Sequence, residues 1–511
     1  MRVGWSYLFI ENHTILAMTM EMAFSKVLNL LIAAFVFSRG VAAITLSPNV
    51  TFGEFTDLIY SGLFEIPGSV FGLGYNAAGI AAGQLVDLPP CVPDVDEDED
   101  ACRNITEMIR SRGFDVENYE VTSEDGYIMS VQRVINPLVD PEYRPKLKPV
   151  ILQHGVLSSA VDWIFNSQYA RPTPWPPGRE SKDSDSEQTP IVGADGLGPE
   201  AEEDRKHPRS LAFYLANRGY DVFLPNSRGS KYSLKHVSKT ILDPSYWDFT
   251  WDEQIDYDMP AIIKFVQETT GYPKIAFVGW SQGSTMMFGL LADRPEYTDI
   301  IEPFVAFAPI AYIYHTNTPV KALLPLLPAL QDFNMGFSFS DAFRYNLKQV
   351  CGPTHAQHLA CLSLANQLYG DNSEGFDLHR IRTLTHHFPA GSSFKDVIHY
   401  AQEIRSEKFC RYNRGVLGNQ QAYGSILPPE YNLTNVRSES MVFFHANNDY
   451  LAAPEDVELL VSQLGVKPMK IINMSEDDPK WNHMAYVYHK KAGILVNPRV
   501  TEILDQFNKQ Q

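Results

Sequence analysis

The sequence predicts an α/β fold with a mostly parallel central sheet and helices on both of its faces. Strand-like apolar runs alternate with helix-like segments between residues 149 and 290, and this alternation is typical of parallel sheets. One such run, residues 275–278, passes into a helix-like segment at residues 285–290 through a very short turn. The sheet is therefore expected to carry a sharp strand–turn–helix unit.

The turn at residues 279–283 reads Gly-Trp-Ser-Gln-Gly. A strand that enters a helix this quickly strains the backbone of the turning residue, and glycines on either side leave room for neighbouring chain. Ser281 is therefore expected to project its hydroxyl as a nucleophile. The backbone amide of Gln282, at the start of the helix, is expected to stabilise an oxyanion. The short pattern alone occurs by chance, and the strand and helix around it favour the catalytic interpretation.

Composition narrows the class of protein. A chain of 511 residues accommodates one large core or a core with a second lobe. Its 44% hydrophobic and 20% charged residues are ordinary for a globular protein and exclude a membrane-spanning bundle. A net charge of -19, with no basic tract, argues against nucleic acid as a partner. The cysteines and histidines show no ligand-like clustering, and we predict neither a metal nor an organic cofactor.

The N-terminal residues have the pattern of an export signal. Lys26 precedes an apolar run at residues 27–37, and Val41 and Ala43 supply the small residues that a signal peptidase needs. The run, about eleven residues long, is shorter than a bilayer-spanning helix requires. We therefore predict a signal peptide at residues 1–43, with an uncleaved anchor as the alternative. Entry into the secretory pathway implies an extracellular or lysosomal destination.

Two features surround this signal. Met20 and Met22 lie where a start codon would give a signal peptide of ordinary length, so each is an alternative start site. Residues 44–103 are predicted to form an N-terminal extension or propeptide, because they show no strand and helix alternation. Their acidic run at residues 94–100 is expected to stay in solvent, since a dense block of like charge repels itself.

Export would bring four N-glycosylation sequons and five cysteines into a compartment where glycans are added and disulfides form. The candidate glycosylation sites are Asn49, Asn104, Asn432 and Asn473. The candidate disulfides join Cys91 to Cys102 and Cys351 to Cys361, each closing a short loop. Cys410 is left over and is interpreted as a buried free thiol, with an intermolecular bridge as the alternative.

The first part of the core is predicted at residues 104–309. It opens with a short helix and a hairpin at residues 119–134, whose turn lies at Gly126. The next strand, residues 149–152, leads into Gly155, which allows the backbone amide of Val156 to face the serine as the second oxyanion donor. His154 beside it is interpreted as a hydrogen-bonded structural histidine.

An abrupt change of composition follows. Residues 166–208 are rich in proline, glycine, serine and acidic residues, so they are predicted to form a flexible surface insertion. The alternation then resumes, with a helix at residues 211–215, a strand at residues 220–224 and a helix at residues 260–268 that leads back to the nucleophile strand.

Several motifs occur in one order along the chain: Ser123-Glu124-Asp125-Gly126-Tyr127, the 153–156 loop, Asn226-Ser227-Arg228-Gly229, Trp247-Asp248-Phe249 with Asp252-Glu253, and the serine turn. In these motifs and their order, the chain resembles the acid lipase family of α/β-hydrolases, which includes gastric and lysosomal acid lipases. The resemblance extends from about Asn104 to the C-terminus. The resemblance implies the α/β-hydrolase fold with an inserted, mainly helical cap domain. The chain departs from the family at Trp280, where histidine is usual, and in its insertion and N-terminal extension.

In this fold the catalytic acid and histidine follow the serine in chain order. Asp449 comes directly after the apolar strand 441–444, so its carboxylate is expected at the sheet's carboxyl edge. His483 follows the strand 469–472, and both residues match the family's motif positions. The competing residues are Asp477, Asp478 and His445, which are interpreted as solvated loop residues or a structural histidine.

Residues 310–429 interrupt the strand order between serine and acid, which makes them the candidate cap or lid, and residues 430–511 complete the core. Fold and family together predict a lipase that hydrolyses carboxylic esters of neutral lipids, triacylglycerols or steryl esters, at a lipid–water interface. The alternatives are a short-chain carboxylesterase, an acyltransferase with the same covalent intermediate, and a non-catalytic lipid-binding protein. No obligate protein partner is inferred.

Overall fold

The computed structural model describes residues 98–177, 198–326, 334–337, 351, 354–372 and 374–508. The chain divides into two compact units, residues 1–87 and 88–511, and every described residue belongs to the second. The predicted signal peptide, the alternative start sites, Asn49 and Cys91 therefore lie outside the described residues. Among the residues that are described, no helix has the length and apolar character needed to cross a membrane.

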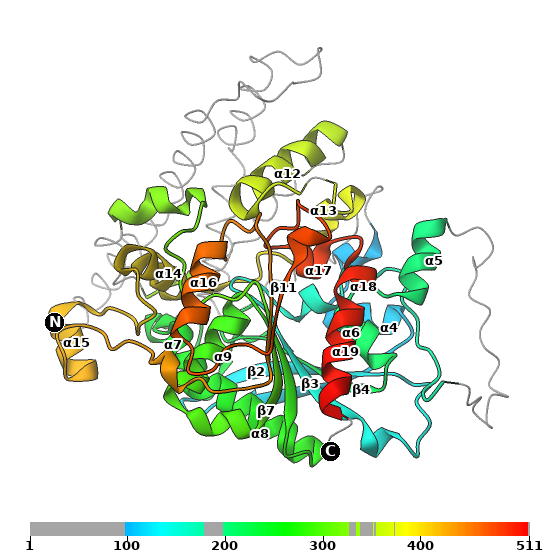
Figure 1. Cartoon of the computed structure of the whole chain (residues 1–511), viewed down its shortest axis with the longest axis horizontal. Coiled ribbons are helices and arrows are strands. Elements are labelled where there is room, and N and C mark those ends of the chain that lie inside the picture. The colour runs from blue at the N-terminus through cyan, green and yellow to red at the C-terminus, as the bar shows by residue number, and fades with distance from the viewer. Residues whose placement is uncertain are drawn as a thin grey trace, which may run out of the picture. The chain divides into compact units, whose positions relative to one another are not determined.

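A mostly parallel sheet lies at the centre of the second unit (Figure 1). Its strands are β1 (Asp115–Thr122), β2 (Tyr127–Ile135), β3 (Lys148–Gln153), β4 (Tyr220–Pro225), β5 (Lys235–His236), β6 (Ile275–Trp280), β7 (Ile301–Phe307), β10 (Met441–His445) and β11 (Lys470–Asn473). They lie in the order β1-β2-β4-β3-β6-β7-β10-β11, with β5 paired to β2. β2 is antiparallel to β1, β4 and β5, whereas every neighbouring pair from β4 to β11 is parallel. The predicted fold class is confirmed.

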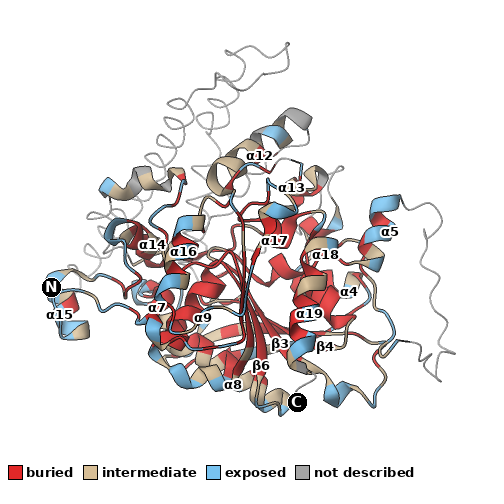
Figure 2. Ribbon diagram, viewed as in Figure 1, coloured by how far each residue is buried: buried red, intermediate tan, exposed pale blue. Residues whose placement is uncertain are grey.

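Helices cover both faces of this sheet, as predicted. On one face lie α4 (Ile105–Ser111), α6 (Leu211–Ala216) and α19 (Asn497–Asn508), and on the other α8 (Met259–Thr270), α9 (Gln282–Asp293) and α16 (Pro454–Gln463). Side chains of β6 alternate between the two apolar clusters that result, with Ala276 and Val278 in one, and Ile275 and Phe277 in the other. Figure 2 shows the buried residues gathered on the strands and the inner helix faces. Burial on both sides explains why β6 is a continuous apolar run.

The remaining α-helices of the described residues are α5 (Pro199–Lys206), α7 (Trp251–Glu253), α12 (His355–Tyr369), α13 (Leu378–Leu384), α14 (Phe394–Ser406), α15 (Gly415–Tyr423), α17 (Ala485–Tyr488) and α18 (Ala492–Leu495). The chain between β7 and β10 contributes α12 to α15 and a small antiparallel sheet of two strands, β8 (Gly336–Phe337) and β9 (Ser392–Ser393). Where it is described, this predicted cap segment is therefore mainly helical. Figure 1 shows α12 and α13 beyond one end of the sheet.

The prediction of a flexible insertion at residues 166–208 is wrong at both of its ends. Ser167 is fully buried, and residues 199–206 form α5. Asp204 of α5 is buried too, and it accepts hydrogen bonds from the Ser167 hydroxyl at 2.7 Å and from the Tyr169 amide at 2.8 Å. A buried polar residue, rather than an apolar face, holds these ends together, so the absence of apolar periodicity was misleading. Residues 178–197 lie outside the described residues.

The prediction that the acidic run stays in solvent is also wrong for Asp100, which is 1% exposed. Its carboxylate accepts hydrogen bonds from Arg112 at the end of α4 at 2.7 Å and from Arg380 of α13 at 2.5 Å. Burial opposes this charge, but the guanidinium groups outweigh burial and hold the pKa of Asp100 well below its ordinary value. The arginines are far away in sequence, so the local run of acids gave no sign of them. The packed core therefore includes Asp100, and its predicted start at residue 104 is too late.

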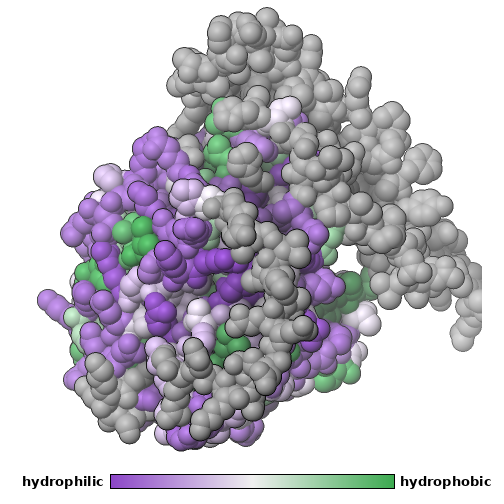
Figure 3. Space-filling view, turned by 90° about the vertical axis from the view of Figure 1, so that its right-hand side faces the viewer, coloured by the Kyte–Doolittle hydropathy of each residue, from purple (hydrophilic) through white to green (hydrophobic). Residues whose placement is uncertain are grey.

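Figure 3 shows the face that lies to the right in Figure 1. Its described residues are mostly hydrophilic, and the hydrophobic ones form separate small patches. This distribution is ordinary for a water-facing surface.

The ion cluster at Asp100 generates the first prediction. Replacing Asp100 by asparagine is expected to lower the free energy of unfolding by about 3–5 kcal/mol, because buried arginines lose their countercharge. Chemical denaturation at pH 7 measures this loss. Glu99→Gln is the matched control, since the Glu99 side chain is 76% exposed and its ion pair with Arg103 is expected to contribute less than about 1 kcal/mol. Equal losses in the two variants would show that burial of the cluster is unimportant.

Candidate active site

Ser281 occupies the sharp turn between β6 and α9, with φ of 55° and ψ of -119°. Positive φ is unfavourable for a residue other than glycine, so packing around the turn must maintain it. Two glycines allow this packing. A Cβ atom on Gly283 would lie 2.4 Å from the carbonyl oxygen of Gln153, and one on Gly279 would lie 2.6 Å from the Gly283 backbone. The predicted strained turn with obligatory glycines is what the structure contains.

Ser281, His483 and Asp449 are in direct contact, although they are far apart in sequence. Nε2 of His483 lies 2.9 Å from Oγ of Ser281. Nδ1 of the same ring lies 2.9 Å from each carboxylate oxygen of Asp449. All three side chains are buried, with at most 4% exposed. This is the arrangement in which a histidine takes a proton from a hydroxyl while a carboxylate orients the ring.

Asp449 lies in the loop that follows β10, at the carboxyl edge of the sheet. Its Oδ1 also accepts hydrogen bonds from the amides of Leu451 and Ala452, both at 2.9 Å. These bonds fix the carboxylate while its charge faces the imidazole. Because β6 and β10 both pair with β7 in parallel, the ends of β6 and β10 lie on the same edge, and this brings serine and acid together.

Two aromatic residues hold the backbone of His483 in place. Nε1 of Trp280 donates to the carbonyl oxygen of His483 at 2.9 Å. The amide of His483 donates to the carbonyl oxygen of Tyr369, at the end of α12, at 3.3 Å, and the Tyr369 ring lies nearly parallel to the imidazole. Trp280, the residue that departs from the family pattern, therefore has a structural contact with the histidine loop. Sequence reasoning noted Trp280 without a role and did not find Tyr369, because no motif marks it.

The predicted oxyanion residues lie on either side of the serine. A Cβ atom on Gly155 would lie 3.1 Å from Cβ of Ser281, so the loop that carries Val156 packs directly against the turn. Gln282 is the first residue of α9. The hydrogen bonds between described residues include none from the backbone amide of Val156 or of Gln282. Two unused amides beside a nucleophile are suited to accept a developing negative charge.

His154 is a structural histidine, as predicted. Its Nδ1 lies 2.8 Å from the carbonyl oxygen of Gly155, and its Nε2 accepts a hydrogen bond from the amide of Ser227 at 3.0 Å. Burial lowers its pKa to about 4, so the ring is neutral and can accept this bond. The side chain thereby fixes the loop that presents Val156.

A buried carboxylate that sequence reasoning missed links the two loops of the site. Asp162 accepts hydrogen bonds from the hydroxyls of Ser158, just after Val156, and of Tyr488, in the helix after His483. No basic residue pairs with it among the described residues, and burial raises its pKa to about 7. Its two hydroxyl partners lie in segments more than three hundred residues apart, so no local pattern reveals the contact.

The competing acids and histidine make other contacts. Asp477 pairs with Arg499 at 2.5 Å, and Asp478 lies 3.5 Å from His489. His445, at the end of β10, is half-buried, and burial lowers its pKa. None of the three contacts Ser281 in the part of the chain that is described.

The cysteine predictions agree with the structure where it can be compared. Cys351 and Cys361 form a disulfide, with an S–S distance of 2.04 Å, and Cys410 is a buried free thiol. Cys102 is also disulfide-bonded, and its predicted partner Cys91 lies outside the described residues.

The three described sequons differ in exposure. Asn104 and Asn432 are exposed, and each caps the start of a short helix. Asn473 is half-buried, and its Nδ2 donates to Oδ1 of Asn447 at 3.2 Å. Glycosylation requires a free Nδ2, so Asn473 is the least accessible of the three predicted sites.

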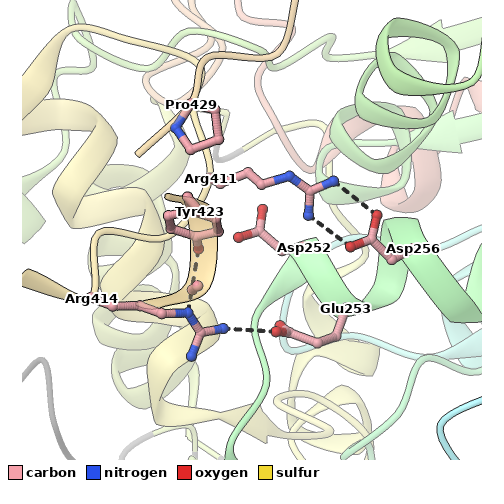
Figure 4. A pocket seen from close by; sticks show the side chains of 8 residues that line it. Asp252, Glu253, Asp256, Arg411, Arg414, Tyr423 and Pro429 are labelled. Atoms are coloured by element: carbon pink, nitrogen blue, oxygen red, sulfur yellow. Dashed lines mark hydrogen bonds and ion pairs between the residues drawn. The ribbon is translucent and has the colours of Figure 1, made fainter. Parts of the chain in front are cut away.

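A pocket of about 450 Å³ lies apart from Ser281 and is lined by charged residues (Figure 4). Its lining is Asp252, Glu253, Asp256, Arg411, Arg414, Ala422, Tyr423 and Pro429. Figure 4 shows that both arginines point at carboxylates. Arg411 bonds Asp256 at 2.7 Å and Arg414 bonds Glu253 at 3.0 Å. The two ion pairs therefore connect α7 and the residues that follow it to the chain around α15, and the pocket lies between these segments.

Comparison with known proteins agrees with this geometry. Residues 105–167 match the family described as a partial alpha/beta-hydrolase lipase region, and residues 196–489 match the alpha/beta hydrolase fold. Human gastric triacylglycerol lipase is 30% identical over 441 residues, which cover 85% of this chain and 97% of that protein. The gastric triacylglycerol lipase of Rattus norvegicus is 32% identical over 393 residues, covering 76% and 87%, and Lipase 1 of Drosophila melanogaster is 29% identical over 411 residues, covering 80% of each.

The chain belongs to the acid lipase family of α/β-hydrolases. This confirms the resemblance inferred from the motifs and makes the chain a carboxylic ester hydrolase. In this chain the serine turn lies between β6 and α9, and tryptophan occupies position 280.

The strained turn generates the second prediction. Gly283→Ala is expected to lower the rate at which a fluorophosphonate labels Ser281 by about 100-fold, since a new Cβ would displace backbone by an ångström or more. Gly198→Ala serves as the control, because a Cβ there meets no atom within 4 Å. A labelling rate within two-fold of the unsubstituted protein for Gly283→Ala would mean that the turn tolerates displacement.

Proposed function

We propose that the chain is a lipase that hydrolyses carboxylic esters of neutral lipids, triacylglycerols or steryl esters, with Ser281 as nucleophile. The observation that carries this proposal is the pair of contacts from His483, 2.9 Å to Ser281 on one side and 2.9 Å to Asp449 on the other. They support a nucleophile, a base and an orienting acid held in one line at a strained, buried turn.

In the proposed reaction, Nε2 of His483 takes the proton of the Ser281 hydroxyl as Oγ attacks the ester carbonyl carbon. The carbonyl oxygen becomes an oxyanion and is stabilised by the amides of Val156 and Gln282. The ester C–O bond then breaks, and the proton on His483 passes to the leaving alcohol. Water, deprotonated by His483, attacks the acyl-enzyme, and the fatty acid leaves as Ser281 regains its proton.

The residues between β7 and β10 support a long apolar acyl group as substrate. Leu324, Tyr369 and Phe388 of this segment are half-buried and pack against the apolar cluster that includes Trp280. Of these three, Tyr369 lies at the site itself, because its ring stacks on that of His483. Each methylene of an acyl chain buried there contributes about 0.8 kcal/mol, so such a lining favours long chains. The relatives named gastric triacylglycerol lipases agree with this substrate class.

We further propose that the protein acts in the secretory pathway, outside the cell or in lysosomes, at the surface of lipid particles. The Cys351–Cys361 disulfide and the exposed sequons at Asn104 and Asn432 support this, because disulfides persist in oxidising compartments and glycans are added in the same pathway. No obligate protein partner is part of this proposal.

Loss of single groups tests the proposed roles. Ser281→Ala is expected to abolish ester hydrolysis without unfolding the protein. Asp449→Asn is expected to lower turnover by about 10⁴-fold, because the amide favours the wrong imidazole tautomer. Asp478→Asn is the matched control and is expected to retain near-normal turnover. If Asp449→Asn retained turnover and Asp478→Asn lost it, the acid would be assigned to the wrong residue.

Acyl-chain preference separates a lipase from a short-chain esterase. We expect long-chain glycerides or steryl esters in micelles to be hydrolysed with higher kcat/KM than soluble acetate esters. Rates compared across acyl lengths between pH 4 and pH 8, in matched dispersions, measure this preference. A preference for acetate or butyrate would favour the short-chain carboxylesterase, and a folded protein that neither hydrolyses esters nor reacts with fluorophosphonate would favour the lipid-binding protein.

A further inference from the structure

Asp396, in the first turn of α14, is a fully buried carboxyl group next to the proposed oxyanion site. Its Oδ2 accepts a hydrogen bond from the Ser392 hydroxyl at 2.6 Å and lies 3.2 Å from Nε2 of Gln282. Gln282 is the residue whose backbone amide faces the developing oxyanion in the proposed reaction. A helix of the segment between β7 and β10 therefore contacts that residue through a carboxyl group.

The side chain of Gln282 lies between two polar groups. Its Nε2 contacts Oδ2 of Asp396 on one side and Oε1 of Gln254, which follows α7, at 3.0 Å on the other. Three buried atoms of this cluster have no hydrogen-bond partner among the described residues, namely Oε1 of Gln282, Nε2 of Gln254 and Oδ1 of Asp396. Two of the three are acceptors without a donor. A protonated carboxyl can donate through its unpartnered oxygen as well as accept, whereas a carboxylate only accepts.

The surroundings of Asp396 contain no compensating charge. No salt bridge joins it to a basic residue in the described part of the chain. Burial, and then the negative charge of Glu253 on α7, disfavour its ionised form, while Ser392, Gln282 and the amide of Trp251 favour it. Tyr400 on the same helix also interacts with Asp396 electrostatically, and burial holds its own pKa well above the ordinary value. The net result is a pKa of about 6 for Asp396.

Building on the proposed function, we propose that Asp396 is a positioning residue for Gln282 and that its carboxyl group must be neutral for full turnover. A negative charge one glutamine side chain away from the oxyanion amide opposes the charge that develops in the transition state, and the dry surroundings screen it poorly. A neutral carboxyl keeps the contact with Gln282 and removes this opposition.

The direction of the pH effect follows from the sign of the charge. Below about pH 6 Asp396 is mostly protonated and neutral, and above this pH it becomes an anion, so turnover declines as the pH rises. His483 has the opposite requirement, since only a neutral imidazole can act as a base. Asp396 thus sets the alkaline side of the profile, and its removal leaves the acid side unchanged.

The test is the pH dependence of Asp396→Asn, whose side chain has the same size and is always neutral. The rate constant for fluorophosphonate labelling of Ser281, and kcat/KM for one soluble ester, are measured from pH 4 to pH 9. We expect the unsubstituted protein to decline by about ten-fold between pH 5 and pH 8, and Asp396→Asn to match it at pH 5 and to lack most of the decline. Asp162 titrates in the same range in both proteins, so the difference between them isolates Asp396.

Two further variants sharpen the test. Ser392→Ala removes a hydroxyl that stabilises the carboxylate, so the decline is expected to move to higher pH without disappearing. Asp456→Asn changes another buried carboxyl, which contacts His315 rather than Gln282, and is expected to keep the original profile. If Asp396→Asn does not fold, as judged by its thermal midpoint, Ser392→Ala decides the question.

An unchanged decline in Asp396→Asn, or a loss that is equal at every pH, would overturn the inference, because a merely structural contact predicts one of these two results. A protein that is neither labelled nor active at any pH would instead reject the proposed function. The two failures are therefore distinguishable.

Discussion

The close approach of backbone segments at Ser281 is the constraint on which the site depends. The end of β3, the end of β6 and the start of α9 meet there, and only glycine fits at positions 279 and 283. Burial of β6 on both sheet faces holds these segments together and maintains the strained φ of 55° at the serine. Packing across the whole sheet thus maintains a local strain that positions one hydroxyl.

Buried charged residues organise the loops around this core. Arg228 bonds Asp125 at 2.6 Å and Asp258 at 2.5 Å, and it lies over the ring of Tyr127. Two of the family motifs, around residues 123–127 and 226–229, therefore meet at one guanidinium group. Asp100 likewise connects the N-terminal turn of the described chain to α13. Such contacts are costly to break because they leave a buried charge unpaired.

The segment between β7 and β10 is part of the site. Its Tyr369 receives the backbone amide of His483, and its Asp396 contacts Gln282, so it reaches both the base and the oxyanion side of the serine. This placement connects the inserted segment to the residues proposed to perform the reaction. The protein therefore has one composite site in which the inserted helices and the sheet loops depend on each other.

The sequence by itself determined the fold class, the serine turn and the chain order of Asp449 and His483, because apolar periodicity, glycine spacing and motif order are local patterns. It left β7 unassigned despite the apolar residues at 304–307. Only the tertiary structure decided that Asp100 and Asp204 are buried, that Tyr369 and Asp162 support the site, and that Asp396 touches Gln282. The physical reason is that each of these polar groups is stabilised by partners distant in sequence, so no local pattern distinguishes it from a solvated residue.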